Sequence, residues 1–144
     1  MEREKYYKYL FIIGAIWNWM VAISLFLMSI FMLELTASIF GIVVPPSLVW
    51  FHIVVGLIFL FGIGYYIVGR DISKNRGIVI IGSIEKFLFF IILLIYFFLG
   101  HLNIFAVLLV IVDFGFGCLF LEFLINNQNY GFFYVKNDLE KWVK

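Results

Sequence analysis

The sequence predicts an all-α integral membrane protein, a four-helix bundle whose two ends lie on the same side of the membrane. Composition is the first reason: 65% of the 144 residues are hydrophobic and 13% are charged, whereas soluble domains are about 45–50% apolar and about 25% charged. The second reason is length. A bilayer core takes roughly 20 helical residues to cross, and four apolar runs reach that length within what we take to be a single domain.

Polar or turn-forming residues bound the apolar runs. Pro45 and Pro46 precede the second run, with Ser47 as a candidate N-cap. Short polar turns at 69–77 and 100–103 separate the last three runs, which should pack as antiparallel neighbours. The apolar stretch 35–44 is too short to span, so we expect it to lie in the interface or fold back over the bundle; a longer, tilted first helix is the alternative. The predicted spans are about residues 9–33, 47–68, 77–99 and 104–125.

Basic residues predict the orientation. Apart from Lys86, every Lys and Arg lies before the first span, between the second and third, or after the fourth. The positive-inside rule therefore predicts that both termini are cytoplasmic. In the tail, residues 126–144, apolar side chains recur at helical spacing, which favours a short amphipathic helix on the inner leaflet over a frayed end; they are Phe132, Val135, Leu139 and Trp142.

Several functions find no support in the sequence. A formal net charge of +1 argues against a nucleic-acid partner, because phosphate contacts need a concentrated basic patch. The single cysteine, Cys118, is expected to be a small packing residue. We find no Walker loop, GxSxG, HExxH or CxxC motif and no nucleophile–base set, which argues against an enzyme, and no cofactor is indicated.

Among the polar side chains inside the predicted spans, we single out Asn18, Glu85, Lys86 and Asp113. At about 1.5 Å per residue they lie roughly 12–18 Å from the inner boundary. An unpaired charge at such depth costs at least about 2.5–3.5 kcal/mol. We therefore expect Lys86, with its long stem, to pair with Asp113, and Asn18 to join them in the bundle interior.

Glu85 poses a separate problem, because it lies about 100° around the helix from Lys86 and the two should not share a direction. It is either protonated or satisfied by a partner, for which the candidates are Tyr65, Tyr66, Asn18 and a neighbouring subunit. A carboxyl group without a partner in its own chain favours a homodimer through the third helix, where Gly82 would allow close approach. A monomer is the alternative.

Two pairs of residues are further candidates. Trp17 and Trp19 flank Asn18 and could wall an aromatic pocket for a flat apolar ligand, or simply pack. His52 and His101 both fall near the outer boundary and could share a haem or a metal ion. Haem sites of that type are usually deeper, so solitary interfacial histidines are the alternative.

The segments GAIWNW (14–19), GIGYYIVGRD (62–71) and NRG (75–77), together with Lys86 and Asp113, resemble small DoxX-like membrane proteins of prokaryotes. The resemblance implies a four-helix bundle in the prokaryotic cytoplasmic membrane. Some relatives are membrane partners of quinone-linked oxidoreductases. The apolar stretch 35–44 and the amphipathic tail are not matched by this resemblance.

Two function classes follow from these observations. In the first, the protein binds a hydrophobic ligand (lipid or quinone-like) or acts as an accessory subunit of a membrane complex. Asn18, Lys86 and Asp113 would then be the polar anchors. In the second, the protein is an ion- or proton-coupled small transporter or a channel-like oligomer, and the same charges titrate. A purely structural polar contact that fixes helix register also stays open.

Overall fold

The computed structural model describes residues 2–127, which form five helices and no strand. Four of these helices are long and apolar enough to cross a membrane, and apart from the earlier start of α1 their bounds fall within two residues of the predicted spans. The predicted amphipathic tail lies outside the described residues. The helices are α1 (Glu2–Phe31), α2 (Leu33–Phe40), α3 (Val49–Arg70), α4 (Arg76–Phe98) and α5 (Ile104–Asn126).

Large apolar side chains cover the outside of the long helices. Ile16 and Met20 on α1, Leu60 on α3, Leu88 on α4 and Leu108 on α5 are each about half exposed or more. Soluble monomers rarely expose continuous apolar surface of this extent. The structure therefore fits an integral membrane protein.

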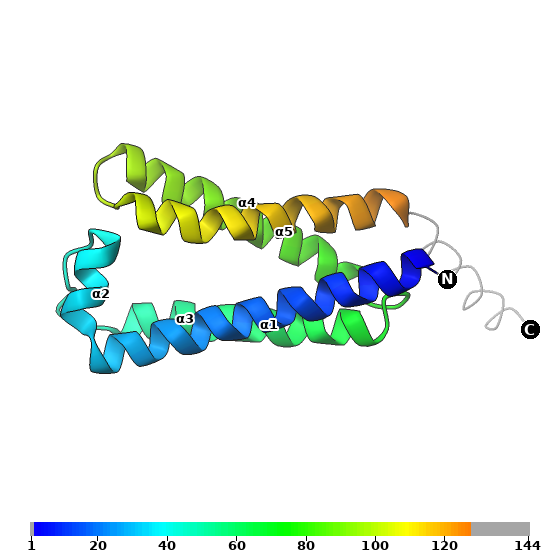
Figure 1. The fold of residues 1–144 in the computed structure, drawn as a ribbon, viewed down its shortest axis with the longest axis horizontal. Helices are drawn as coiled ribbons and strands as arrows, with labels where there is room; N and C mark the ends of the chain where they lie inside the picture. Colours follow the sequence, from blue (N-terminus) through cyan, green and yellow to red (C-terminus); the bar gives the residue numbers. More distant parts are fainter. Residues whose placement is uncertain (1, 128–144) are drawn as a thin grey trace, which may run out of the picture.

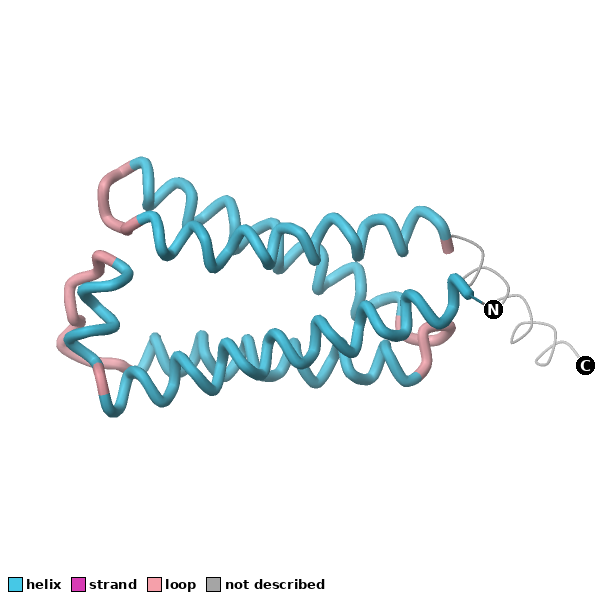
Figure 2. Tube along the Cα trace, in the orientation of Figure 1, coloured by secondary structure: helices cyan, strands magenta, loops and turns pink. Residues whose placement is uncertain are grey.

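The four long helices form two antiparallel pairs (Figures 1 and 2). In one pair α1 packs along α3, and in the other α4 packs along α5. The pairs converge at the end that holds the start of α1 and the α3–α4 turn, and they separate toward the end that holds α2. We expected α3 and α4 to be neighbours throughout, but their close contacts, Gly64 with Ile78 and Gly82 with Tyr65, lie near the turn that joins them.

Glycines set the close approach of α1 and α3. A Cβ atom at Gly62 would lie 2.6 Å from the Trp19 ring, and one at Gly69 would lie 2.8 Å from the Ile12 side chain. Such approaches are possible only where the helix carries no side chain. The indole of Trp19 therefore occupies the space over Gly62.

An aromatic core fills the end where the pairs converge. Phe11 of α1, Tyr65 of α3 and Phe120 of α5 are fully buried, and the Tyr65 and Phe120 rings meet edge to face at 4.9 Å. The Arg76 guanidinium group donates to the carbonyl groups of Leu124 and Asn127 and so caps the C-terminus of α5. This end of the molecule is closed.

The α3–α4 turn is held by its own polar groups. The Asp71 carboxylate accepts hydrogen bonds from the backbone N–H and the hydroxyl group of Ser73, and it forms an ion pair with Lys74. The Ser73 hydrogen bonds, followed by the contact with Lys74, hold the pKa of the Asp71 carboxyl group below its usual range.

The stretch after α1 folds back over the helix ends and does not extend α1. Its helix, α2, is capped at its C-terminus by Gly41, which has a φ of 72°. The Asn103 backbone N–H, at the start of α5, donates to the Phe40 carbonyl at 2.8 Å, and the Asn103 side chain donates to the Ser38 carbonyl at 3.2 Å.

The N-cap of α3 is Leu48 rather than Ser47, although the Ser47 hydroxyl group accepts from the Val49 N–H at 3.4 Å.

Candidate functional site

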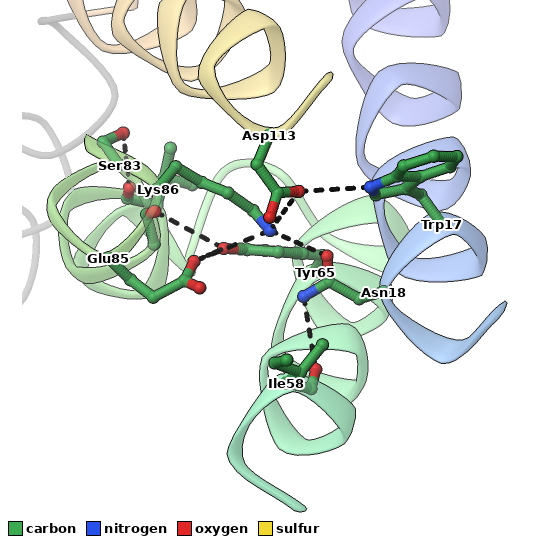
Figure 3. Close-up of polar contacts among 10 residues, drawn as sticks. Trp17, Asn18, Ile58, Tyr65, Ser83, Glu85, Lys86 and Asp113 are labelled. Atoms are coloured by element: carbon green, nitrogen blue, oxygen red, sulfur yellow. Dashed lines mark hydrogen bonds and ion pairs between the residues drawn. The ribbon is translucent and has the colours of Figure 1, made fainter. Parts of the chain in front are cut away.

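Lys86, at the middle of α4, is the centre of a polar cluster. Figure 3 shows its contacts. Its Nζ atom donates to Asn18 Oδ1 and to Asp113 Oδ1, both at 2.8 Å. The side chain is only 1% exposed, so this is a buried ion pair supported by an amide. The predicted meeting of Lys86 with Asp113 and Asn18 is confirmed, and it joins the two helix pairs.

Small residues and one backbone carbonyl position these side chains. Gly117, one turn after Asp113, leaves room for Lys86, because a Cβ atom there would lie 3.2 Å from Lys86 Cβ. Asn18 Nδ2 donates to the Ile58 carbonyl of α3 at 3.2 Å, which fixes the amide oxygen toward Lys86. All four long helices therefore contribute to the cluster or its support.

The two tryptophans that flank Asn18 have different roles. Trp17 Nε1 donates to Asp113 Oδ1 at 3.1 Å, so Trp17 is a polar partner, whereas we expected it only as an apolar wall. The feature that could have predicted this polar role is the indole N–H of Trp17, because such a group usually has a hydrogen-bond acceptor when it is buried. Trp19 lies against Gly62 in the α1–α3 contact, and its buried N–H has no acceptor among the described residues.

Glu85 has partners within its own chain. The Tyr65 hydroxyl group donates to Glu85 Oε2 at 3.0 Å, and Lys86 Nζ lies 3.7 Å from the same oxygen. The expectation that Glu85 and Lys86 cannot share a direction is therefore wrong, because the flexible Lys86 stem lets its ammonium group lie between Glu85 and Asp113. The argument for a homodimer rested on a carboxyl group without a partner, and that ground is removed.

The two histidines lie on different helix pairs. His52 Nε2 lies 3.0 Å from the Ser29 hydroxyl group and stacks obliquely near Phe26, on the α1–α3 pair. His101, in the α4–α5 turn, contacts the Tyr96 ring. Within residues 2–127 no group of three or more potential metal ligands is present.

A cavity of about 200 Å³ lies between the separated helix pairs. Asp113 alone among its lining residues is polar, and the cavity extends from there past Phe89, Leu109 and Val55 to Phe40, at the end of α2. A water molecule needs about 10–15 Å³ of such space, and apolar cavities of about 150 Å³ can stay dry and bind small aromatic molecules. The space is thus larger than a packing defect and suits an apolar occupant.

A second cavity, of about 240 Å³, adjoins the first. Its lining residues Val21, Leu25, Phe40 and Leu109 also line the first cavity, and Met20, which is 52% exposed, lies at its rim. The shared residues belong to α1, α2 and α5, at the opening between the two pairs. The cavity is therefore accessible from the apolar flank of the molecule.

Comparison with protein-family models, with curated proteins and with solved structures finds no match for this chain. The resemblance to DoxX-like proteins stays a prediction.

Proposed function

We propose that the protein is an integral membrane protein, with both termini cytoplasmic, that binds a hydrophobic small molecule between its two helix pairs. The main observation that supports this proposal is the apolar cavity with Asp113 in its wall. Ligand sites of this kind combine apolar walls with a few fixed polar groups. Here the polar group is held in place by Lys86 and Trp17.

The second cavity supports an entry route for such a ligand. It opens between α1 and α5 beside Met20 and leads to residues of the first cavity. A ligand dissolved in the bilayer could enter sideways without crossing water. Methionine suits such an opening, because its flexible thioether side chain adapts to irregular apolar surfaces.

Native mass spectrometry of the gently purified protein tests this proposal. We expect a retained hydrophobic molecule in the wild type and its loss in Ala106→Phe, since Ala106 is 5% exposed and lines the cavity. The matched control is Leu108→Phe on the same helix, where the side chain is 53% exposed. A co-purified subunit without a small molecule would favour an accessory role, and retention by Ala106→Phe would contradict the proposed site.

Ion- or proton-coupled transport is the second candidate. It is favoured by two carboxyl groups, Glu85 and Asp113, around the single Lys86 ammonium group. Against it, the four long helices are continuous, whereas transporter sites are typically formed by broken helices. The buried aromatic core around Tyr65 also lies between the cluster and the end that holds the α3–α4 turn. Vesicles containing the protein and a pH-sensitive dye should show no proton flux above protein-free vesicles.

A further inference from the structure

The hydrogen-bond donors of the polar cluster are already in use. Lys86 Nζ, which has three N–H groups, donates to Asn18 Oδ1 and Asp113 Oδ1 and forms an ion pair with Glu85 Oε2 at 3.7 Å. The Trp17 N–H and the Tyr65 hydroxyl group also donate within the cluster. Asn18 is 1% exposed, so its remaining N–H does not reach the cavity. A ligand carbonyl group would find no free donor here.

One acceptor of the residue that lines the cavity remains without a donor. Among the described residues, both donors to Asp113 bind Oδ1, so Oδ2 accepts no hydrogen bond from them. The Asp113 side chain is 19% exposed, whereas that of Lys86 is 1% exposed, and Asp113 lines the cavity. The group that a ligand meets is therefore the carboxylate.

The charged groups of the cluster also favour a ligand that donates a hydrogen bond. Glu85 and Asp113 together carry two carboxyl groups against the one ammonium group of Lys86. A carboxylate accepts hydrogen bonds and donates none when ionised. Such a site attracts a donor or a cation and repels the lone pairs of a carbonyl oxygen.

We propose, on the basis of the ligand cavity proposed above, that the occupant is an apolar molecule whose polar group is a hydrogen-bond donor, a hydroxyl or an ammonium, bound by Asp113 Oδ2. The cavity walls receive its apolar body. The same site discriminates against molecules whose polar end carries only acceptors, such as ketones, quinones and ethers.

Three matched probes test the proposal: para-propylphenol, para-propyltoluene and para-propylbenzaldehyde. They share an apolar body and differ in carrying a donor, no polar group or an acceptor. Their dissociation constants would be measured with the protein in lipid nanodiscs, with empty nanodiscs as the control for partitioning. We expect the phenol to bind about tenfold or more tightly than either analogue, as a hydrogen bond to a charged group allows.

The Asp113→Asn variant supplies a second readout. It keeps one oxygen for Lys86 and Trp17 and presents an amide N–H₂ group where Oδ2 was, so the preference should shift from the phenol toward the aldehyde. If this variant does not fold, the three probes on the wild type still decide. Equal affinities, or tighter binding of the aldehyde by the wild type, would overturn the donor preference but leave the cavity as a binding site. Binding of none of the probes would overturn both proposals.

Discussion

Lys86 helps to join the two helix pairs at mid-length, since it contacts Asn18 of α1 and, within its own pair, Asp113 of α5. A buried charge is tolerated when its partners satisfy it, and it becomes costly when one partner is removed. The structure therefore predicts unequal effects of single and paired substitutions in the cluster.

Lys86→Met and Asp113→Leu should each lower the free energy of unfolding in detergent by about 3 kcal/mol, because each leaves an opposite charge without its main partner. The double variant should recover part of the combined loss. Recovery should be incomplete, because the Trp17 N–H loses its acceptor in both backgrounds that lack Asp113. Strictly additive losses would mean that the two side chains do not interact.

Tyr65 and Tyr66 are adjacent but differ in burial, which makes them a matched pair. Tyr65→Phe removes the donor to Glu85 and should cost about 1–3 kcal/mol of stability. Tyr66 is 38% exposed, and its hydroxyl group accepts a hydrogen bond from the exposed Arg70 alone among residues 2–127, so Tyr66→Phe should change stability by less than about 0.5 kcal/mol. Thermal unfolding of both variants in one detergent measures the difference, and equal effects would contradict the assigned Glu85 partner.

At the scale of the helices, the contact between α1 and α3 depends on the absence of side chains at particular turns. Gly62→Ala would place a methyl group 2.6 Å from the Trp19 ring, so we expect a loss of about 1–3 kcal/mol. Gly56→Ala, on the same helix, meets nothing within 4 Å and should be neutral or stabilising by up to about 1 kcal/mol, because alanine favours helix. A thermal shift of the same sign and size in both variants would show that Gly62 is not a close contact.

The helices and the centre of the cluster were predictable from sequence, because both follow from the order of apolar and polar residues along the chain. Long apolar runs define the spans, and the depth of Lys86, Asp113 and Asn18 along them requires that they pair. The cavity was not predictable in this way. Phe89 and Leu109 have the same apolar character whether they face lipid, a neighbouring helix or an empty space. The angle between the helix pairs decides which of these surroundings each side chain has, and the apolar pattern does not encode that angle.

Glu85 illustrates the same limit at shorter range. Helical spacing separates it from Lys86, but the path of a long side chain brings the Lys86 ammonium group to 3.7 Å from its carboxylate. Helical spacing predicts the direction in which a side chain leaves the helix, but it does not predict the position of the charged group at the end of a long, flexible side chain.

At the scale of the whole molecule, the described basic residues outside the cluster gather at one end. Arg3, Lys5 and Lys8 precede the apolar part of α1, and Arg70, Lys74 and Arg76 surround the α3–α4 turn at the same end of the fold (Figure 1). We predict that this end is cytoplasmic. Reporter fusions at either terminus should give a cytoplasmic signal and an insertion at residue 102 an extracytoplasmic one. The reverse pattern would overturn the proposed orientation.

The two ends of the molecule also differ in their expected roles, because one end holds the buried core and the other holds the cavity. The aromatic core closes one end, the polar cluster lies at mid-length, and the cavity occupies the half that α2 and Asn103 cover. Stability should depend mainly on the closed half and ligand retention on the open half. We therefore expect the open half to hold an apolar molecule.

Photo-cross-linking with an apolar aryl diazirine that carries an alkyl chain tests that claim most directly. In nanodiscs, peptide mass spectrometry should find label on Phe89 and Leu109, which line the cavity, in addition to label on outward residues such as Leu88. Cavity label should disappear in Ala106→Phe and persist in Leu108→Phe. Label confined to outward residues, or cavity label unchanged by Ala106→Phe, would contradict the account.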